Sequence, residues 1–291
     1  MLNVVTWTID PILFEIGPVR IGWYGIFFAV GLIIFGAGIL AKMWAHEGLT
    51  EKSFNSLVLY VLIATVVGAR LGHCLFYEPE YFLAHPEEII KTWKGGLASH
   101  GGVIGIMIAV WIYSRKVSHQ SMLWTFDRLC VPTGLVAAMI RLGNLMNHEI
   151  YGHATDVPWA FRFIENVNQW RLGADPVFSA PSHPTQLYEA LVYLITFGVC
   201  MWLYWRRDAQ KHEGLIFGVS MVMIFVARFF IEFVKNDQVG FEAGMHLNMG
   251  QWLSIPFILV GIASIVYSLR RPVKEYYRGG NSIYKKQSNN K

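Results

Sequence analysis

Long apolar runs separated by short polar stretches dominate the chain. A helix needs about 20 mostly apolar residues to cross the hydrocarbon core of a bilayer. Segments of this kind cover residues 21–42, 55–77, 97–114, 123–146, 186–205, 214–234 and 250–269. Because backbone polar groups find no water inside lipid, segments of this length are expected to be helical. The pattern therefore predicts an all-α integral membrane protein with about seven transmembrane helices.

The stretches between these segments differ in length and character. Residues 78–96 contain the acidic sequence EPEYFLAHPEEII, which suggests a helix lying on the surface. Residues 147–185 mix polar and aromatic side chains and are too long for a simple hairpin. They predict a small extramembrane cap inserted into a transmembrane catalytic domain of residues 1–269, followed by a basic, disordered tail of residues 270–291. The first twenty residues lack a basic start, so we expect no cleaved signal peptide.

Composition agrees with a membrane protein. Apolar residues make up 54% of the chain and charged residues 15%, against about 25% charged in typical globular chains. The three cysteines lie inside apolar segments without metal-type spacing, and no metal or cofactor is predicted. Most of the formal net charge of +4 lies in the tail. Because that tail directly follows a span, a nucleic-acid partner is not expected.

The distribution of Lys and Arg predicts the orientation. With the C-terminus inside, the inner segments hold the larger share of basic residues: Lys42, Lys52, Arg115, Lys116, Arg206, Arg207, Lys211 and the basic residues of the tail. The outer segments hold Arg20, Lys91, Lys94, Arg162, Arg171 and Lys235. The positive-inside rule therefore favours an outer N-terminus and an inner C-terminus, although the tail supplies half of the inner residues.

With this orientation, the polar residues of the spans gather near the outer face. Six of the seven spans contribute, with Trp23, Tyr24, Arg70, His73, His100, Arg141, Asn144, Asn147, Gln186, Tyr188, Glu189, Arg228 and Glu232. Only Asp127 and Arg128 lie toward the inner face. Polar groups inside a span are expensive and are usually functional or paired. The gathering therefore indicates a shared polar cavity at one side of the membrane.

Spacing supports such a cavity but leaves individual roles open. Arg141, Asn144 and His148 follow each other at helical spacing on one face. Arg228 and Glu232 are four residues apart and can pair.

The alternative is a purely structural role, in which these groups hold neighbouring helices together. It is favoured for Arg70, with one of several acids as partner, and is an even choice for Glu232. His100 is flanked by glycines that allow close approach, which favours a function.

Arginine and histidine in a lipid-facing cavity suggest particular chemistry. A guanidinium group is permanently charged and offers planar, paired donors that suit phosphate. Histidine titrates near pH 6.5 and can accept a proton. The residues alone thus indicate an enzyme or carrier that handles a phospholipid headgroup at the outer face, without naming the reaction.

The sequence RLGNLMNHEIYG at residues 141–152 resembles the signature of bacterial prolipoprotein diacylglyceryl transferases, R-[IL]-G-N-F-x-N-x-E-x-x-G. Other family motifs follow in the same order along the chain. They match Trp23-Tyr24-Gly25, Gly68-Ala69-Arg70-Leu71-Gly72, Ser99-His100-Gly101-Gly102, His183-Pro184-Thr185-Gln186-Leu187-Tyr188-Glu189, Arg228 to Phe233, and Met249-Gly250-Gln251. Each motif is weak alone, but together they cover residues 20 to 260 and are specific.

The resemblance implies transfer of the diacylglyceryl group of phosphatidylglycerol to the lipobox cysteine of a prolipoprotein bound through its signal peptide. The enzyme would work among membrane lipids in the bacterial cytoplasmic (inner) membrane, with its active site toward the periplasmic face. The implied catalytic residues are His100, Arg141 and Arg228. The implied substrate-binding residues are Arg141, Tyr24, Asn144, Gly101, Gly102, Asn147, Glu149 and Glu232.

Several positions of the chain stand out against the family pattern. Ile224 stands where many members carry Tyr, Lys235 stands where Arg often follows the Glu-Phe motif, and His148 occupies the variable position of the signature. Competing interpretations are a lipid transporter or flippase, a different phospholipid headgroup transferase and a purely structural subunit. A transporter predicts polar residues throughout the membrane depth, and a metal-dependent transferase predicts clustered Asp, which the sequence lacks.

Overall fold

The computed structural model describes residues 4–17, 19–92, 95–236 and 247–273. The described residues divide into two compact units, one within residues 4–40 and 127–273 and the other within residues 41–126. The boundaries between them fall inside two helices, α2 (Gly38–His46) and α6 (Met122–Met146). Of the basic tail predicted at residues 270–291, all but the first four residues lie outside the described part of the chain.

Within the described residues, six helices are long and apolar enough to cross a membrane. They are Trp23–His46, Glu51–Phe76, Met122–Met146, Thr185–Arg207, Leu215–Val234 and Met249–Leu269. The first combines α1 (Trp23–Ala29), the π-helix η1 (Val30–Ala37) and α2. The others are α3 (Glu51–Phe76), α6, α8 (Thr185–Arg207), α9 (Leu215–Ile231) with the 3₁₀ turn η6 (Glu232–Val234), and α10 (Met249–Leu269). The chain is therefore mostly helical and has the helices of a multi-pass membrane protein.

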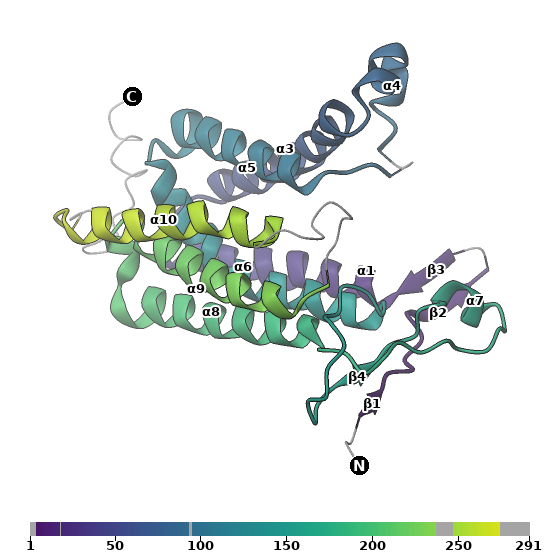
Figure 1. Ribbon diagram of the computed structural model, residues 1–291. Coiled ribbons are helices and arrows are strands. Elements are labelled where there is room, and N and C mark those ends of the chain that lie inside the picture. Colours follow the sequence, from purple (N-terminus) through teal and green to yellow (C-terminus); the bar gives the residue numbers. More distant parts are fainter. Residues whose placement is uncertain (1–3, 18, 93–94, 237–246, 274–291) are drawn as a thin grey trace. The chain divides into compact units, whose positions relative to one another are not determined.

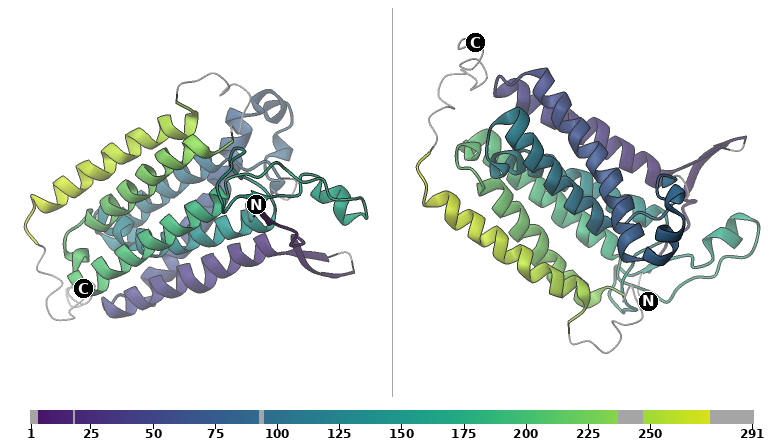
Figure 2. Two further views of the ribbon diagram at one scale, coloured as in Figure 1. Left: turned by 60° about the horizontal axis from the view of Figure 1, so that its bottom comes forward. Right: turned by 90° about the horizontal axis from the view of Figure 1, so that it is seen from above.

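The first unit contains most of these helices. α9 packs against both α8 and α10, and the three lie side by side in Figure 1 and Figure 2. α10 starts with a capping box, in which Asn248 and Gln251 satisfy each other's backbone N–H groups. Gly218 of α9 and Gly261 of α10 meet so closely that a Cβ atom on Gly218 would lie 2.7 Å from the Gly261 carbonyl oxygen. Small residues thus let these two helices approach, as is common within membranes.

Residues between α6 and α8, together with the N-terminus, form irregular structure with short strands. β1 (Val5–Thr6) pairs in parallel with β4 (Phe161–Arg162), and β2 (Ile12–Ile16) pairs with β3 (Val19–Gly22) in an antiparallel ribbon. A short helix, α7 (Val167–Arg171), follows β4. The side chains of Phe163 and Ile164 are buried. The hydropathy pattern did not predict these strands, because two to five residues carry too little signal.

The second unit contains α3 and α5 (Ser99–Tyr113), which continues into the π-helical turn η4 (Ser114–Ser118). The predicted span 97–114 is thus a helix, but it is shorter than expected and is not one of the six. In the part of residues 78–96 that the structure describes, the predicted surface helix is present as α4 (Pro79–Ala84) and the 3₁₀ turn η2 (Pro86–Glu88). Thr50 caps α3 by accepting a hydrogen bond from the Ser53 amide.

Candidate active site

Arg141 and Asn144 lie one turn apart near the end of α6 and interact directly. Arg141 Nη1 donates to Asn144 Oδ1 at 3.1 Å. Asn144 Nδ2 donates to Glu149 Oε1 at 2.8 Å, and Asn147 Nδ2 donates to the same oxygen at 3.1 Å. Four of the predicted site residues therefore form one continuous hydrogen-bonded set.

A tight turn after α6 brings Glu149 back to the helix. The helix ends at Met146, and His148 and Ile150 have positive φ angles of 57° and 62°. The Glu149 amide then donates to the Asn144 carbonyl oxygen at 3.1 Å. Left-handed backbone at residues other than glycine is uncommon and often marks functional sites. The turn brings the Glu149 carboxylate within hydrogen-bond distance of the Asn144 and Asn147 side chains.

His148 has a structural role in this turn. Because the helix ends before it, the prediction that His148 shares a helical face with Arg141 is wrong. Its Nδ1 accepts a hydrogen bond from the Ile164 amide at 3.1 Å, so in the neutral ring Nε2 carries the proton and donates to the Ile9 carbonyl at 2.9 Å. Burial lowers the pKa of His148. Both ring nitrogens therefore hold backbone segments together.

Arg141 also begins a series of alternating charges that links three helices. Its Nε lies 2.7 Å from Glu189 Oε2 on α8. Glu189 Oε1 lies 3.4 Å from Lys235 Nζ, which lies 3.5 Å from Glu232 Oε1. The same Glu232 oxygen lies 3.3 Å from Arg228 Nη2 on α9, which confirms the predicted pairing of these two residues. We call these five residues the charge network.

The charge network is buried at its centre and more open at its two ends. The side chains of Glu189, Lys235 and Glu232 are 1%, 3% and 6% exposed, whereas those of Arg141 and Arg228 are 16% and 32% exposed. Buried charges are tolerated only when they are paired. Two carboxylates balance three cations, which leaves one formal positive charge. The two arginines are the most exposed members of the network, and guanidinium groups favour phosphate or carboxylate.

Glu232 is held by the start of α10 as well. Asn248 Nδ2 donates to Glu232 Oε2 at 3.2 Å. A Cβ atom on Gly250 would lie 2.5 Å from the Glu232 carboxyl carbon, so any larger residue would displace this carboxylate. The Met-Gly-Gln motif at the start of α10 thus combines a helix cap with space for Glu232.

Tyr24, at the start of α1, lies against α6 beside Asn144. A Cβ atom on Gly143 would lie 2.8 Å from Tyr24 Cδ2 and 3.1 Å from Tyr24 Cα. The ring is partly exposed and stacks on Phe28 with centroids 6.5 Å apart. The structure therefore brings Tyr24 to the helix that carries Arg141 and Asn144.

His100, Gly101 and Gly102 lie in the second unit, at the start of α5. The exposed His100 ring stacks on Tyr77 with centroids 6.4 Å apart. Gly101 faces α3, where a Cβ atom would lie 2.2 Å from the Gly68 carbonyl oxygen. Close helix packing is thus a sufficient reason for glycine at residue 101. The structure describes these three residues only among their own neighbours and not relative to the charge network.

Arg70 is a structural tie, as favoured from the sequence, but its partners are not acids. Its guanidinium donates to the carbonyl oxygens of Glu88, Ile89, Gly95 and Gly96 at 2.6 to 3.1 Å. It also lies 4.9 Å from the centre of the Phe82 ring. Arg70 therefore orders the segment between α3 and α5.

Asp127, at the opposite end of the spans, also has a structural role. Its carboxylate accepts hydrogen bonds from the Gly214 amide at 2.6 Å and the Phe217 amide at 2.8 Å. It thus caps the N-terminus of α9, where backbone N–H groups lack helical partners. In the described part of the chain, no group of three or more His, Cys, Asp or Glu side chains is arranged to hold a metal ion.

The sequence profile of the prolipoprotein diacylglyceryl transferase family matches residues 11–267. The chain belongs to this family. A phosphatidylglycerol–prolipoprotein diacylglyceryl transferase of Porphyromonas gingivalis is 54% identical over 276 residues, which cover 93% of this chain and 97% of that protein. Proteins of the same name from Chloroherpeton thalassium and Bacteroides fragilis are 46% and 42% identical, over 92% and 94% of this chain and 96% and 99% of theirs. Family membership makes the chain a transferase.

The sequence of this diacylglyceryl transferase did not reveal two central members of the charge network. Glu189 was predicted to be one of the polar residues near the outer face, within the His-Pro-Thr-Gln-Leu-Tyr-Glu motif, but not an ion-pair partner. Lys235 was noted as an outer basic residue and as a departure from the family pattern. A carboxylate inside a span requires a cationic partner, and the position of Glu189 in a predicted span indicated such a partner. Several arginines were available, and spacing along one helix does not reveal partners on another.

Proposed function

We propose that this transferase moves the diacylglyceryl group of phosphatidylglycerol to the thiol of the lipobox cysteine of a prolipoprotein. The products are a thioether-linked diacylglyceryl prolipoprotein and glycerol phosphate. The charge network is the observation that carries the proposal, because it orients two arginines and retains one positive charge. That charge complements the single negative charge of a phosphodiester. The names of the relatives support the two substrates.

In the proposed reaction, the cysteine thiol loses its proton to His100. An ordinary thiol has a pKa near 8.5, and the thiolate is the nucleophile, so a base increases its reactive fraction. The sulfur forms a bond to the glyceryl carbon that carries the phosphate ester, and the carbon–oxygen bond breaks. Its electron pair leaves with glycerol phosphate. Arg141 and Arg228 stabilise the charge that grows on this phosphate.

The remaining predicted residues bind and orient the lipid headgroup. Tyr24 and Asn144 position it. Glu149 accepts hydrogen bonds from Asn144 and from Asn147 and so holds Asn144 in place. Glu232 orients Arg228. Gly102 allows the substrate to approach the backbone beside His100, whereas Gly101 is required by the packing of α5 on α3.

We propose seven spans in the bacterial cytoplasmic (inner) membrane, with the N-terminus outside, the C-terminus inside and the active site near the periplasmic face. α5 is the additional span. It runs antiparallel to α3, because Gly101 meets Gly72 while Tyr113 hydrogen-bonds Ser53 at 2.6 Å. Between these contacts α3 advances about 28 Å and α5 about 18 Å at 1.5 Å per residue, and the turn η4 extends α5 toward the thickness of the hydrocarbon core.

A transporter or flippase is less well supported. It needs polar groups that are free to bind cargo through the membrane depth. Asp127, a predicted inner-face candidate, is instead occupied by the backbone of α9.

The proposal is tested with purified protein, phosphatidylglycerol and a lipobox peptide, with the thioether product detected by mass spectrometry. Replacing Arg141 with Ala is expected to lower the transfer rate by about 10²–10³-fold, the loss typical of removing one charge-stabilising donor. Arg115→Ala removes an exposed arginine elsewhere and is expected to keep the parent rate. Near-normal transfer by Arg141→Ala, or product formation with a peptide that carries Ser in place of Cys, contradicts the proposal.

A further inference from the structure

The ribbon formed by β2 and β3 has one apolar and one polar face. Phe14 pairs with Ile21, and Ile16 pairs with Val19, so these four side chains share a face. Glu15 pairs with Arg20 on the opposite face. Phe14, Ile16 and Val19 are 42%, 67% and 56% exposed. An isolated two-stranded ribbon is at best marginally stable in water, so this apolar face requires a covering.

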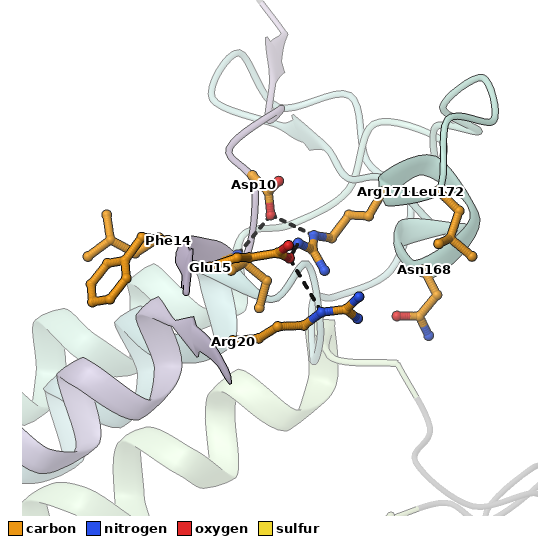
Figure 3. Close-up of a pocket in the computed structure, with 9 residues that line it drawn as sticks. Asp10, Phe14, Glu15, Arg20, Asn168, Arg171 and Leu172 are labelled. Atoms are coloured by element: carbon orange, nitrogen blue, oxygen red, sulfur yellow. Dashed lines mark hydrogen bonds and ion pairs between the residues drawn. The ribbon is translucent and has the colours of Figure 1, made fainter. Parts of the chain in front are cut away.

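The polar face is attached to the rest of its unit by ion pairs. Arg171, at the end of α7, bonds to Asp10 at 2.9 Å and to Glu15 at 2.5 Å, and Glu15 also lies 3.4 Å from Arg20. These groups line a cavity of about 570 Å³. Figure 3 shows Phe14 pointing away from the side on which Arg171 and Asn168 lie. The ion pairs therefore fix which face of the ribbon is turned outward.

The ribbon is also directly continuous with a membrane span. Gly22, the last residue of β3, is the N-cap of α1, and the partly exposed Trp23 follows it. Trp favours the membrane–water interface. At about 3.3 Å per residue, Val19 lies within roughly 10 Å of the start of the span. The interfacial layer on each side of the hydrocarbon core is about 5–8 Å thick, so the ribbon begins inside this layer.

We propose that the apolar face of the β2–β3 ribbon docks on the membrane, among the lipids of the leaflet in which α1 begins. In the orientation proposed above, this is the outer leaflet. Phe14, Ile16, Val19 and Ile21 contact the acyl region, while Glu15 and Arg20 face water and the Arg171 side chain. The ion pairs with Arg171 hold the ribbon at this level.

The docking is tested by spin labelling in lipid nanodiscs of phosphatidylethanolamine and phosphatidylglycerol. Single cysteines replace Ile16, Val19 or, as a control, the exposed Asp175, in an active background in which Cys74, Cys130 and Cys200 are Ala. Collisions of each label with oxygen, which concentrates in lipid, are compared with collisions with a water-soluble nickel chelate. The oxygen-to-nickel ratio is expected to be several-fold higher at residues 16 and 19 than at residue 175.

Two outcomes overturn the proposal. Nickel access at residues 16 and 19 equal to that at residue 175 places the ribbon in water. Low access of both reagents places it against protein instead of lipid. Arg171→Ala is expected to increase the mobility of the Ile16 label, whereas Asn168→Ala, which lines the same cavity, is expected to leave it unchanged. Since these readouts measure depth and mobility, they are independent of the transfer reaction.

Discussion

At the scale of single residues, Lys235 joins the two halves of the charge network. Its side chain is 3% exposed, and its ammonium group lies between the carboxylates of Glu189 and Glu232, each of which holds one arginine. Lys235 does not need to touch substrate to affect the reaction. Since it fixes the carboxylates that orient Arg141 and Arg228, we infer that it is a positioning residue.

Replacing Lys235 with Met is expected to destabilise the protein and slow transfer together. Two buried carboxylates lose their shared cation, and breaking a buried ion pair costs about 3–5 kcal/mol. Lys235→Arg keeps the charge and is expected to recover most of both properties. Thermal unfolding and initial rates measure the two effects. The control Lys211→Met breaks the more exposed pair with Asp208 and should cost about 0–1 kcal/mol. A Lys235→Met protein as stable as the parent contradicts this role.

From the buried ring of His148 we predict that the stability of the folded protein depends on pH. Burial lowers the pKa of its ring in the folded protein, so the unfolded chain binds the proton first. The neutral His148 ring therefore contributes its full share of the folding stability above the unfolded pKa of about 6.5. This contribution declines as the pH falls toward the lower folded pKa. We expect the unfolding temperature to fall between pH 7.5 and pH 5, and His148→Gln to be less stable at pH 7.5 but less sensitive to pH. An identical pH profile for both proteins excludes His148 as the cause.

Local spacing predicted some side-chain partners and could not predict others. Residues one turn apart, Arg141 with Asn144 and Arg228 with Glu232, do interact. The bond from Arg141 to Glu189 joins residues far apart in sequence, and several acids were equally available. Arg70 shows a second limit, because its carbonyl partners depend on the path of a loop that hydropathy does not specify.

At the scale of elements, glycines determine how α3 and α5 pack. A Cβ atom on Gly101 would lie 2.2 Å from the Gly68 oxygen and 2.7 Å from Gly72 Cα, which are backbone atoms that cannot turn aside. At Gly102 the nearest atoms would be 3.7 Å away, an ordinary contact. The packing of α5 on α3 therefore requires glycine at residue 101 but not at residue 102.

Gly101→Ala is expected to lower the free energy of unfolding by about 1–3 kcal/mol, because the two helices must move apart. Transfer should fall with stability. Gly102→Ala is expected to unfold near the parent temperature, and its transfer rate falls alone if substrate approaches the backbone there. Denaturation and activity measured on the same preparations distinguish the two. Unchanged stability of Gly101→Ala is the result that excludes the close packing.

The hydropathy pattern predicted the long helices well, because twenty apolar residues in succession have few other stable conformations. It did not predict the β2–β3 ribbon, whose strands of five and four residues are brief and include charged residues. It also overestimated the length of α5, which ends at Tyr113 before a π-helical turn that contains Arg115 and Lys116. Short elements depend on contacts with distant segments, which no local pattern encodes.

At the scale of the whole molecule, the number of spans decides whether the two termini lie on the same side. With only the six long helices as spans, both termini lie on one face, whereas a crossing by α5 separates them. α5 alone is about 22 Å long at 1.5 Å per residue, shorter than the hydrocarbon core. Its following π turn contains the basic residues Arg115 and Lys116, which suit the inner interface. Whether the number of spans is even or odd, and so whether the termini lie on the same side, therefore depends on α5 alone.

Cysteine labelling in spheroplasts tests this parity. In the active background without native cysteines, we expect Thr8→Cys and Glu80→Cys to react with a membrane-impermeant maleimide in intact cells. Lys116→Cys and Asp208→Cys should react only after permeabilisation. All four residues are exposed, so access depends on the side of the membrane. If Glu80 and Lys116 react from the same side, α5 does not cross. Since Thr8 precedes the first span, its reaction tests whether the N-terminus is outside independently of α5, whereas the side of Asp208 relative to Thr8 changes if α5 does not cross.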